Sequence, residues 1–348
     1  MVAIWVKLAD NKREVKYCNT HDKRKLKFDM RKIITIGESV LDTFFKDGKP
    51  VKASVGGRIA NATASLGMLG VPVAMCSECC ADSVGDMIVD FFEKHNVDVK
   101  SIDRYTDGAT PISVIFEQED GSAKLVNYGV YPNDRFDVIW PRIDENDIII
   151  FGSLYAIDAP QRDRLFELVQ YAVERKAIIL YMPGFQHGVN FRITRVLTAI
   201  LENLEVSNLV VAHDRDINDI FPGEDAEKAY HSHIEFYCPT YVHIHDDQSV
   251  DVFVGKEHYH FASPDTKVEN WLGWQSGFSA GLVYQILLAG ITRDQMASLD
   301  AETVKQMVDA AFDFAAQSAA AADNCITAAF AEGKAKAYAE AEAQRQQA

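Results

Sequence analysis

From Lys32 onward the sequence alternates short apolar runs with amphipathic windows, and this alternation limits the possible folds more than any other feature. The apolar runs have the length of strands and cover residues 33–36, 73–76, 147–151, 177–181 and 209–212. Windows with helical spacing lie between several of them, at residues 87–94, 161–175 and 191–204. Continuous apolar strands joined by helices are typical of a parallel sheet that is covered on both faces. The sequence therefore predicts an α/β sandwich with a mainly parallel sheet.

Size and charge limit the kind of partner. With 348 residues, of which 48% are hydrophobic, the chain can bury the core of one large or two smaller domains. A net charge of -16 argues against nucleic acid or an anionic membrane surface as the main partner, and a small polar ligand fits better. No apolar run approaches the length of a membrane span, and residues 1–30 lack the apolar core of a signal peptide. We therefore expect a cytoplasmic protein.

The cysteines give little sign of a metal or redox site. Three of the six form a C-x-x-C-C cluster, and the full set is Cys18, Cys76, Cys79, Cys80, Cys238 and Cys325. No second pair lies at zinc-ribbon spacing. We predict reduced, half-buried thiols.

Two glycine-containing motifs near the start of the sandwich suggest a ligand site. Gly37-Glu38-x-x-x-Asp42 follows the first apolar run, and Gly56-Gly57-x-x-x-Asn61 follows soon after it. Paired glycines let the backbone approach a ligand closely, and an asparagine amide offers both a donor and an acceptor to a hydroxyl group. The alternative is that the glycines only make a tight turn and that Asn61 only begins a helix.

A third motif lies near the other end of the chain, at residues 270–281. Glycines and small residues precede an apolar run with helical spacing, which predicts a loop that opens a helix. Free N–H groups at such a helix start attract anions, so the segment has the features of a phosphate-binding loop.

Together these motifs resemble those of the ribokinase-like (PfkB-type) carbohydrate kinases. The resemblance implies a three-layer α/β/α sandwich with a small β lid, covering residues 30–330, with lid segments at about 43–54 and 111–130. In that family the lid often pairs with a second lid, which implies a homodimer. Met30 could be the ancestral start of the chain, so that residues 1–29 are an added extension that forms either an edge ribbon or a disordered arm. Residues 331–348 are expected to form a frayed or solvent-exposed helical tail.

By the resemblance, the amino-terminal motifs bind a sugar or a sugar-like polyol. The residues that would contact it are Asp42, Gly56, Gly57, Arg58 and Asn61. The Asp42 carboxylate would accept hydrogen bonds from neighbouring diol oxygens, and Arg58 could meet an anionic sugar acid.

The family pattern at the carboxy-terminal motif is D-T-x-G-A-G-D-x-F-x-x-G, and this chain keeps only part of it. Gly273, Phe278 and Gly281 match, but Ser276 stands at the catalytic aspartate. The anion hole would consist of Gly273, Trp274, Gln275 and Gly277, of which Trp274 and Gln275 replace the family's Ala-Gly. Serine is no useful base at neutral pH, and a general base is worth about 10²- to 10⁴-fold in rate. Trp271 and Trp274 could fill the phosphate space, pack in the core or stack on a ring ligand.

Three further departures lie on the nucleotide side. Met182-Pro183-Gly184 replaces D-P-N, Ile244-His245-Asp246 replaces T-x-G, and the N-x-x-E motif that organises Mg²⁺ has only Asp216, in an uncertain register. We favour a catalytically silent relative that still binds a sugar. The alternative is an active kinase that uses ATP and Mg²⁺ by a modified mechanism. A nicotinamide dehydrogenase fits poorly, because no G-x-G-x-x-G opens the first helix.

Three H-x-H pairs lie within a short stretch, at His231/His233, His243/His245 and His258/His260. On a strand, positions two apart share a face, so each pair could chelate a transition metal. Surface or half-buried histidines without a metal are the alternative, and the sequence alone assigns no metal site.

Overall fold

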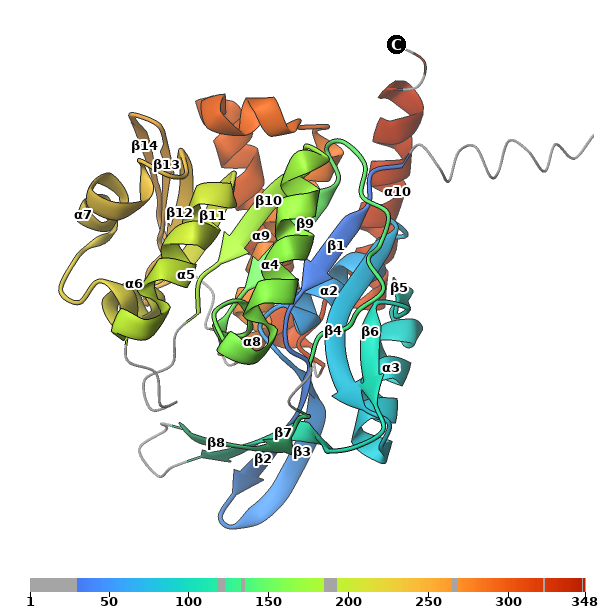
Figure 1. Cartoon of the computed structure of the whole chain (residues 1–348). Coiled ribbons are helices and arrows are strands. Elements are labelled where there is room, and N and C mark those ends of the chain that lie inside the picture. Colours follow the sequence, from blue (N-terminus) through green and yellow to red (C-terminus); the bar gives the residue numbers. More distant parts are fainter. Residues whose placement is uncertain are drawn as a thin grey trace, which may run out of the picture. The chain divides into compact units, whose positions relative to one another are not determined.

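The computed structural model in Figure 1 describes residues 30–117, 123–132, 135–184, 193–264, 268, 270–321, 323–345 and 347. The predicted extension at residues 1–29, including Cys18, lies outside these ranges. The described residues from Arg31 onward form one compact unit.

The centre of the body is a ten-stranded sheet. Along its main path the strands lie in the order β14-β13-β12-β11-β10-β9-β1-β4-β5, and β6 also pairs with β4. These strands are β1 (Ile33–Ile36), β4 (Val73–Cys80), β5 (Val97–Asp98), β6 (Ile102–Tyr105), β9 (Ile148–Gly152), β10 (Ile178–Met182), β11 (Leu209–His213), β12 (Thr240–Ile244), β13 (Val250–Val254) and β14 (Glu257–Phe261). All pairs from β12 to β5 are parallel, and only β13 and β14 are antiparallel. The prediction of a mainly parallel sheet is confirmed.

The strand in the middle shows why the apolar runs have this form. Ile33 of β1 pairs with Val73 on one side and with Ile148 on the other. All four residues of β1 are buried, because helices cover both faces of the sheet. The five predicted strand runs all fall on strands, with ends displaced by a few residues at most.

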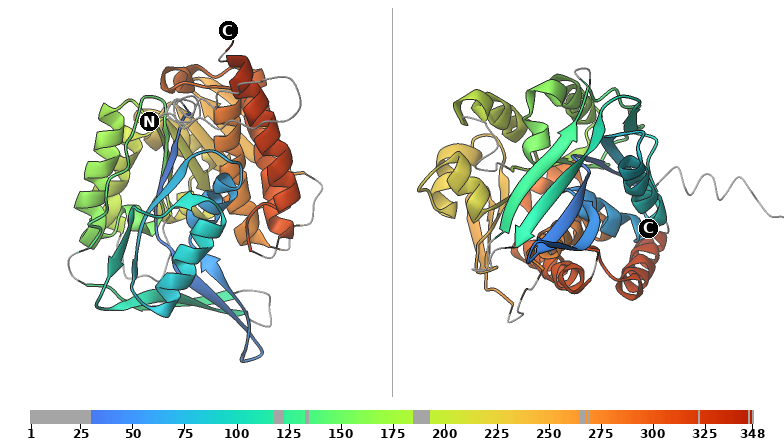
Figure 2. Two further views of the ribbon diagram at one scale, coloured as in Figure 1. Left: turned by 90° about the vertical axis from the view of Figure 1, so that its right-hand side faces the viewer. Right: turned by 90° about the horizontal axis from the view of Figure 1, so that it is seen from below.

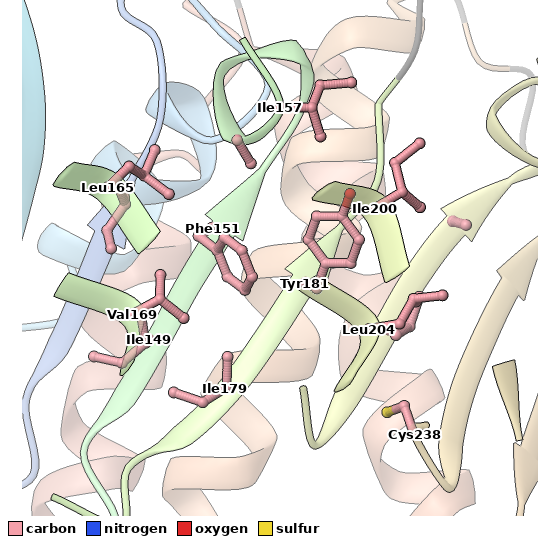
Figure 3. Close-up of a cluster of buried hydrophobic side chains, with 14 of the residues drawn as sticks. Ile149, Phe151, Ile157, Leu165, Val169, Ile179, Tyr181, Ile200, Leu204 and Cys238 are labelled. Atoms are coloured by element: carbon pink, nitrogen blue, oxygen red, sulfur yellow. The ribbon is translucent and has the colours of Figure 1, made fainter. Parts of the chain in front are cut away.

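Helices form the two outer layers, as the left view of Figure 2 shows. They are α2 (Ala60–Gly67), α3 (Ser83–Lys94), α4 (Ala159–Glu174), α5 (Ile193–Val206), α6 (Asp214–Ile220), α7 (Ala226–Ala229), α8 (Trp271–Leu288), α9 (Ala301–Ala320) and α10 (Ala328–Arg345), with short helical turns η1 (Leu154–Ala156), η2 (Tyr230–Ile234) and η3 (Arg293–Ser298). On one face, Leu165 and Val169 of α4 and Ile200 of α5 pack with the buried side chains of β9 and β10 (Figure 3). Helices α8 and α9 cover the other face (Figure 2).

A second, four-stranded sheet lies beside the main one (Figure 1). Its strands are β2 (Val40–Lys46), β3 (Lys49–Gly56), β7 (Ala109–Glu117) and β8 (Ala123–Val130), in the order β3-β2-β7-β8. These strands contain the two segments predicted for a lid, which confirms the small sheet. The turn predicted at residues 119–122 lies outside the described residues.

The segment predicted as a frayed or solvent-exposed helical tail lies mostly in α10. Most of its described residues are exposed or half-buried, but Tyr338 is buried, and the Tyr284 hydroxyl of α8 donates a hydrogen bond to the Lys334 carbonyl at 3.1 Å. The Arg345 guanidinium donates to the last carbonyls of α8, at Leu287 and Leu288. Tyr338 and these hydrogen bonds thus hold a helix that has no full apolar stripe.

The C-x-x-C-C cluster lies on β4, where Cys76, Cys79 and Cys80 are buried free thiols. Burial raises the pKa of Cys76 and of Cys79 to about 12, which keeps both thiols protonated and unreactive. The described residues include no helix with the length and apolar character that crossing a membrane requires.

Candidate functional site

Polar side chains and one backbone carbonyl, that of Pro183, gather where neighbouring parallel strands end, next to the small sheet. Glu38 follows β1, Ser153 follows β9, Pro183 follows β10, and His213 is the last residue of β11. Ligands of open α/β sheets bind at the carboxyl ends of strands, because the ends of adjacent parallel strands meet there.

Asp42 lies on β2 of the small sheet and is only 7% exposed. Burial raises the pKa of its carboxyl to about 7, the nearby Glu38 carboxylate adds to this, and the Ser113 hydroxyl and Lys52 oppose it. A side chain at Gly56, on the paired strand β3, would overlap the Asp42 carboxylate. Gly56 is therefore needed to make room for this buried acid.

Glu38 organises the turn that carries the paired glycines. The Ser153 hydroxyl donates to one Glu38 carboxylate oxygen, and the Arg58 backbone N–H donates to the other at 3.3 Å. Gly57 has φ +122, and any side chain there would overlap the Glu38 carbonyl. Burial raises the pKa of Glu38, while the hydrogen bond from Ser153 lowers it.

Sequence reasoning placed Glu38 only in the G-E-x-x-x-D motif and missed Ser153 altogether. Ser153 adopts φ 56, a left-handed conformation that is uncommon for a non-glycine residue. Such backbone conformations gather at functional sites, but a lone serine carries no sequence signal for one.

Asn61 lies in the first turn of α2 and is 3% exposed. Its amide oxygen Oδ1 is buried and has no hydrogen-bond partner among the described residues. An unpaired buried acceptor is unfavourable by about 1–3 kcal/mol. A ligand hydroxyl would supply the missing donor.

Arg58 is held in an ion pair. Its guanidinium donates to both carboxylate oxygens of Asp216, at 2.9 and 2.5 Å, and to the Pro183 carbonyl at 2.7 Å. Asp216 lies in the first turn of α6 and also accepts the His213 backbone N–H at 3.1 Å. His213 and Asp216 thus lie at the strand end and helix start where the family's N-x-x-E pattern is expected. Both terminal nitrogens of the Arg58 guanidinium are thus bonded within the protein, whereas its Nε has no hydrogen-bond partner among the described residues.

Gln275, which belongs to the carboxy-terminal motif, lies next to His213. Its side-chain nitrogen lies 3.4 Å from His213 Nδ1. Burial and the neighbouring Arg58 charge lower the pKa of His213 to about 3, so the imidazole is neutral. The structure therefore brings Arg58, Asp216 and Gln275 together around one buried histidine that the sequence did not single out as a site residue.

The predicted phosphate-binding loop is helical instead. The Asn270 side chain caps α8 by accepting the Gly273 N–H at 3.1 Å, so the helix already begins at Trp271. A Cβ at Gly273 would lie 2.5 Å from the Ser318 carbonyl, and one at Gly277 would lie 2.5 Å from the Phe314 carbonyl. Both glycines thus face α9 and let the two helices approach closely.

Ser276 lies inside this helix and is 4% exposed. Its hydroxyl donates to the Leu272 carbonyl one turn earlier, at 2.8 Å. Trp274 is also buried and stacks between Trp271 and Phe278, with ring centroids 5.1 and 5.3 Å away. Among the three possible roles of Trp274, which were filling the phosphate space, packing in the core and stacking on a ring ligand, this geometry agrees with core packing.

Solved structures of sugar kinases share this fold. An aminoimidazole riboside kinase from Salmonella enterica, crystallised with aminoimidazole riboside and an ATP analog, superposes with a TM-score of 0.72 at 15% identity, covering 87% of this chain and 99% of that one. A fructokinase from Vibrio cholerae O395, crystallised with fructose, ADP and calcium ion, gives a TM-score of 0.73 at 15% identity, covering 86% and 97%. At these identities the likeness shows the fold alone.

A sequence relative and a family model extend the comparison. A sugar kinase from Pyrococcus horikoshii, described as uncharacterized, is 22% identical over 202 residues, which span 53% of this chain and 62% of the relative. The model of the pfkB family carbohydrate kinases matches residues 30–328, which include both sheets and the three motifs. The chain therefore belongs to the pfkB family of carbohydrate kinases.

Proposed function

We propose that this protein binds a sugar or a sugar-like polyol and that its phosphoryl transfer is lost or strongly impaired. The proposal rests mainly on the identity and the surroundings of Ser276. It stands where the family has its catalytic aspartate, it is buried in α8, and its hydroxyl is bonded to the Leu272 carbonyl. No carboxylate at that position is available to take the proton from an attacking hydroxyl.

The sugar side supports the binding half of the proposal. Asp42 supplies two carboxylate oxygens as acceptors, and Asn61 supplies an amide oxygen without a partner among the described residues. Gly56 and Gly57 keep the backbone beside these groups free of side chains. Acceptors that are held in place by the protein match the vicinal hydroxyl groups of a polyol.

The nucleotide side does not fit ATP and Mg²⁺. Both carboxylate oxygens of Asp216 are bonded to Arg58, and one of them also accepts the His213 N–H. The Gly273 N–H, which would belong to the anion hole, is capped by Asn270. The groups that would meet a metal-bound triphosphate are thus engaged within the chain.

An active kinase with a modified mechanism is the second candidate, and Asp42 favours it. With a pKa raised to about 7, this carboxyl could accept a proton at neutral pH. In such a mechanism Asp216 would have to leave its ion pair with Arg58 before it could help to hold Mg²⁺.

The two candidates are separated by measuring melting temperature and ADP release with a panel of sugars, polyols and ribosides, with and without ATP and Mg²⁺. We expect one class of compound to raise the melting temperature while ADP release stays at the level of a protein-free blank. Asp42→Asn should abolish the shift. Asp90→Asn, which changes an exposed aspartate of α3, is the matched control and should retain it.

Turnover at ordinary kinase rates, about 1–100 s⁻¹, would refute the loss of activity. Absence of a melting-temperature shift with every compound would refute the binding half of the proposal.

A further inference from the structure

The three H-x-H pairs differ in what surrounds them, and one pair meets an acidic residue from another element. His243 lies on β12 and His245 directly follows this strand, so both imidazoles emerge on the same face, with ring centroids 4.5 Å apart. Asp214, the first residue of α6, lies against both rings. Strands β11 and β12 are parallel neighbours, so the helix that follows one meets the end of the other.

Ligand-type atoms of these three residues converge. Asp214 Oδ1 lies 2.6 Å from His243 Nε2 and 3.2 Å from His245 Nδ1. One ligand atom from each residue lies within 4.8 Å of the others, close enough for a single ion to bridge all three after a small adjustment. We propose that Asp214, His243 and His245 form a site for a divalent transition-metal ion such as Zn²⁺, which two imidazole nitrogens and one carboxylate oxygen can bind.

The surrounding residues orient each proposed ligand. The second nitrogen of His243, Nδ1, lies 2.6 Å from the Tyr241 hydroxyl, and the second nitrogen of His245, Nε2, lies 2.7 Å from an Asp251 oxygen. The other Asp214 oxygen accepts the Asp246 backbone N–H at 2.8 Å. Outer hydrogen bonds of this kind fix the tautomer and the ring orientation of metal-binding histidines. Each of His243, His245 and Asp214 has one such outer hydrogen bond.

The outer partner Asp251 is itself held by a second histidine pair. His258 Nε2 and His260 Nδ1 lie 2.9 and 2.8 Å from its Oδ1. The third pair lies elsewhere, with His231 bonded to Glu235 and His233 paired with Glu224. Two of the three pairs therefore contribute to one centre. His243 and His245 are the proposed ligands, and His258 and His260 hold Asp251.

Exposure shows where the centre opens. The His243 side chain is 1% exposed, whereas those of His245 and Asp214 are 26% and 37% exposed. An ion would be anchored to the core on one side and would face solvent on the other. Three protein ligands with an open side leave a coordination position for water or for an oxygen of a bound molecule.

Metal content and affinity test the site. The full chain, prepared without a polyhistidine tag, is stripped with a chelator, reloaded with Zn²⁺, Co²⁺ or Mg²⁺, and assayed by elemental analysis and by competition with a chromophoric chelator. We expect one Zn²⁺ or Co²⁺ per chain and no comparable retention of Mg²⁺. Asp214→Asn and His245→Gln should each weaken Zn²⁺ binding more than about tenfold, and Asp251→Asn should weaken it about 10- to 100-fold.

His231→Gln serves as the matched control, because it changes an H-x-H histidine outside the centre and should leave Zn²⁺ affinity unchanged. Circular dichroism of each variant confirms that it is folded. The proposal is overturned if the wild-type chain retains no Zn²⁺, or if Asp214→Asn and His245→Gln both bind Zn²⁺ as tightly as the wild type. Loss of Zn²⁺ on Cys76→Ser with no effect of Asp214→Asn would also overturn it, because it would place the ion at the cysteines of β4.

Discussion

Asp42 is a carboxyl in surroundings that favour its neutral form. Burial has the largest effect, and Glu38 adds negative charge nearby, so the pKa rises from 3.8 to about 7. Because the folded chain holds this proton more tightly than the unfolded chain, the resulting stability is complete below about pH 4. It is lost as the pH rises through about 7, and a shift of this size corresponds to roughly 4 kcal/mol.

Asp42→Asn should remove this pH dependence. The amide cannot ionise, so we expect the free energy of unfolding to fall less between pH 5 and pH 8 in the variant than in the wild type, measured by urea denaturation. Asp90→Asn controls for the loss of one surface charge. An unchanged slope in Asp42→Asn would show that Asp42 does not cause the dependence.

At the other end of the candidate site, Ser276→Asp tests whether a single residue would account for the proposed loss of activity. The new carboxylate would be buried and would replace a hydroxyl that is bonded within the helix. We expect a free energy of unfolding lower by about 2 kcal/mol or more and no gain in ADP release. Ser276→Ala, the control, should lose about 1 kcal/mol or less. Full turnover by Ser276→Asp would show that the start of α8 still accepts a triphosphate.

At the scale of elements, the packing of α8 against α9 explains the glycines of the carboxy-terminal motif. Gly273, Gly277 and Gly281 recur every fourth residue, and a Cβ at any of them would lie 2.5 Å from a carbonyl oxygen of α9. Residues four apart lie on one side of a helix, so the three glycines form a continuous seam. Helix packing alone therefore accounts for glycine at these three positions.

Gly277→Ala should therefore force the two helices apart. We expect a loss of about 1–3 kcal/mol in the free energy of unfolding, the range for overpacking a core. Gly333→Ala in α10 is the matched control. A Cβ there meets nothing within 4 Å, so the better helix former should stabilise the chain by up to about 1 kcal/mol. Equal effects of the two changes would contradict the seam.

At the scale of the whole molecule, large apolar side chains are exposed on the edge strands of the small sheet. Tyr128 and Val130 on β8 and Val51 on β3 are 59%, 65% and 61% exposed, and both strands are edges of the small sheet. Exposed apolar edge strands favour association. We propose that two lids pair in a homodimer.

Sedimentation equilibrium should then give twice the chain mass of 38.8 kDa. Val130→Lys should shift the protein toward monomer, because it places a charge on the pairing edge. Phe236→Lys changes an apolar residue that is 89% exposed outside the lid and should leave the mass unchanged. A monomeric wild type, or dissociation by Phe236→Lys alone, would argue against lid pairing.

The order of apolar runs and helical windows determined the layered fold, because strands covered on both faces must be apolar throughout. Two short motifs likewise pointed to Asp42, Gly56 and Gly57 on the proposed sugar side, because a backbone that approaches another group closely requires glycine. The family followed from these features.

Only the tertiary structure decided the state of the other half of the site. Whether residues 270–281 form a loop or a helix depends on the cap at Asn270 and on the fit of three glycines against α9, which is distant in sequence. The pairing of Arg58 with Asp216 and the meeting of Asp214 with His243 join residues from different strand ends. Such contacts are set by sheet order and not by local sequence, so no single stretch of the chain could reveal them.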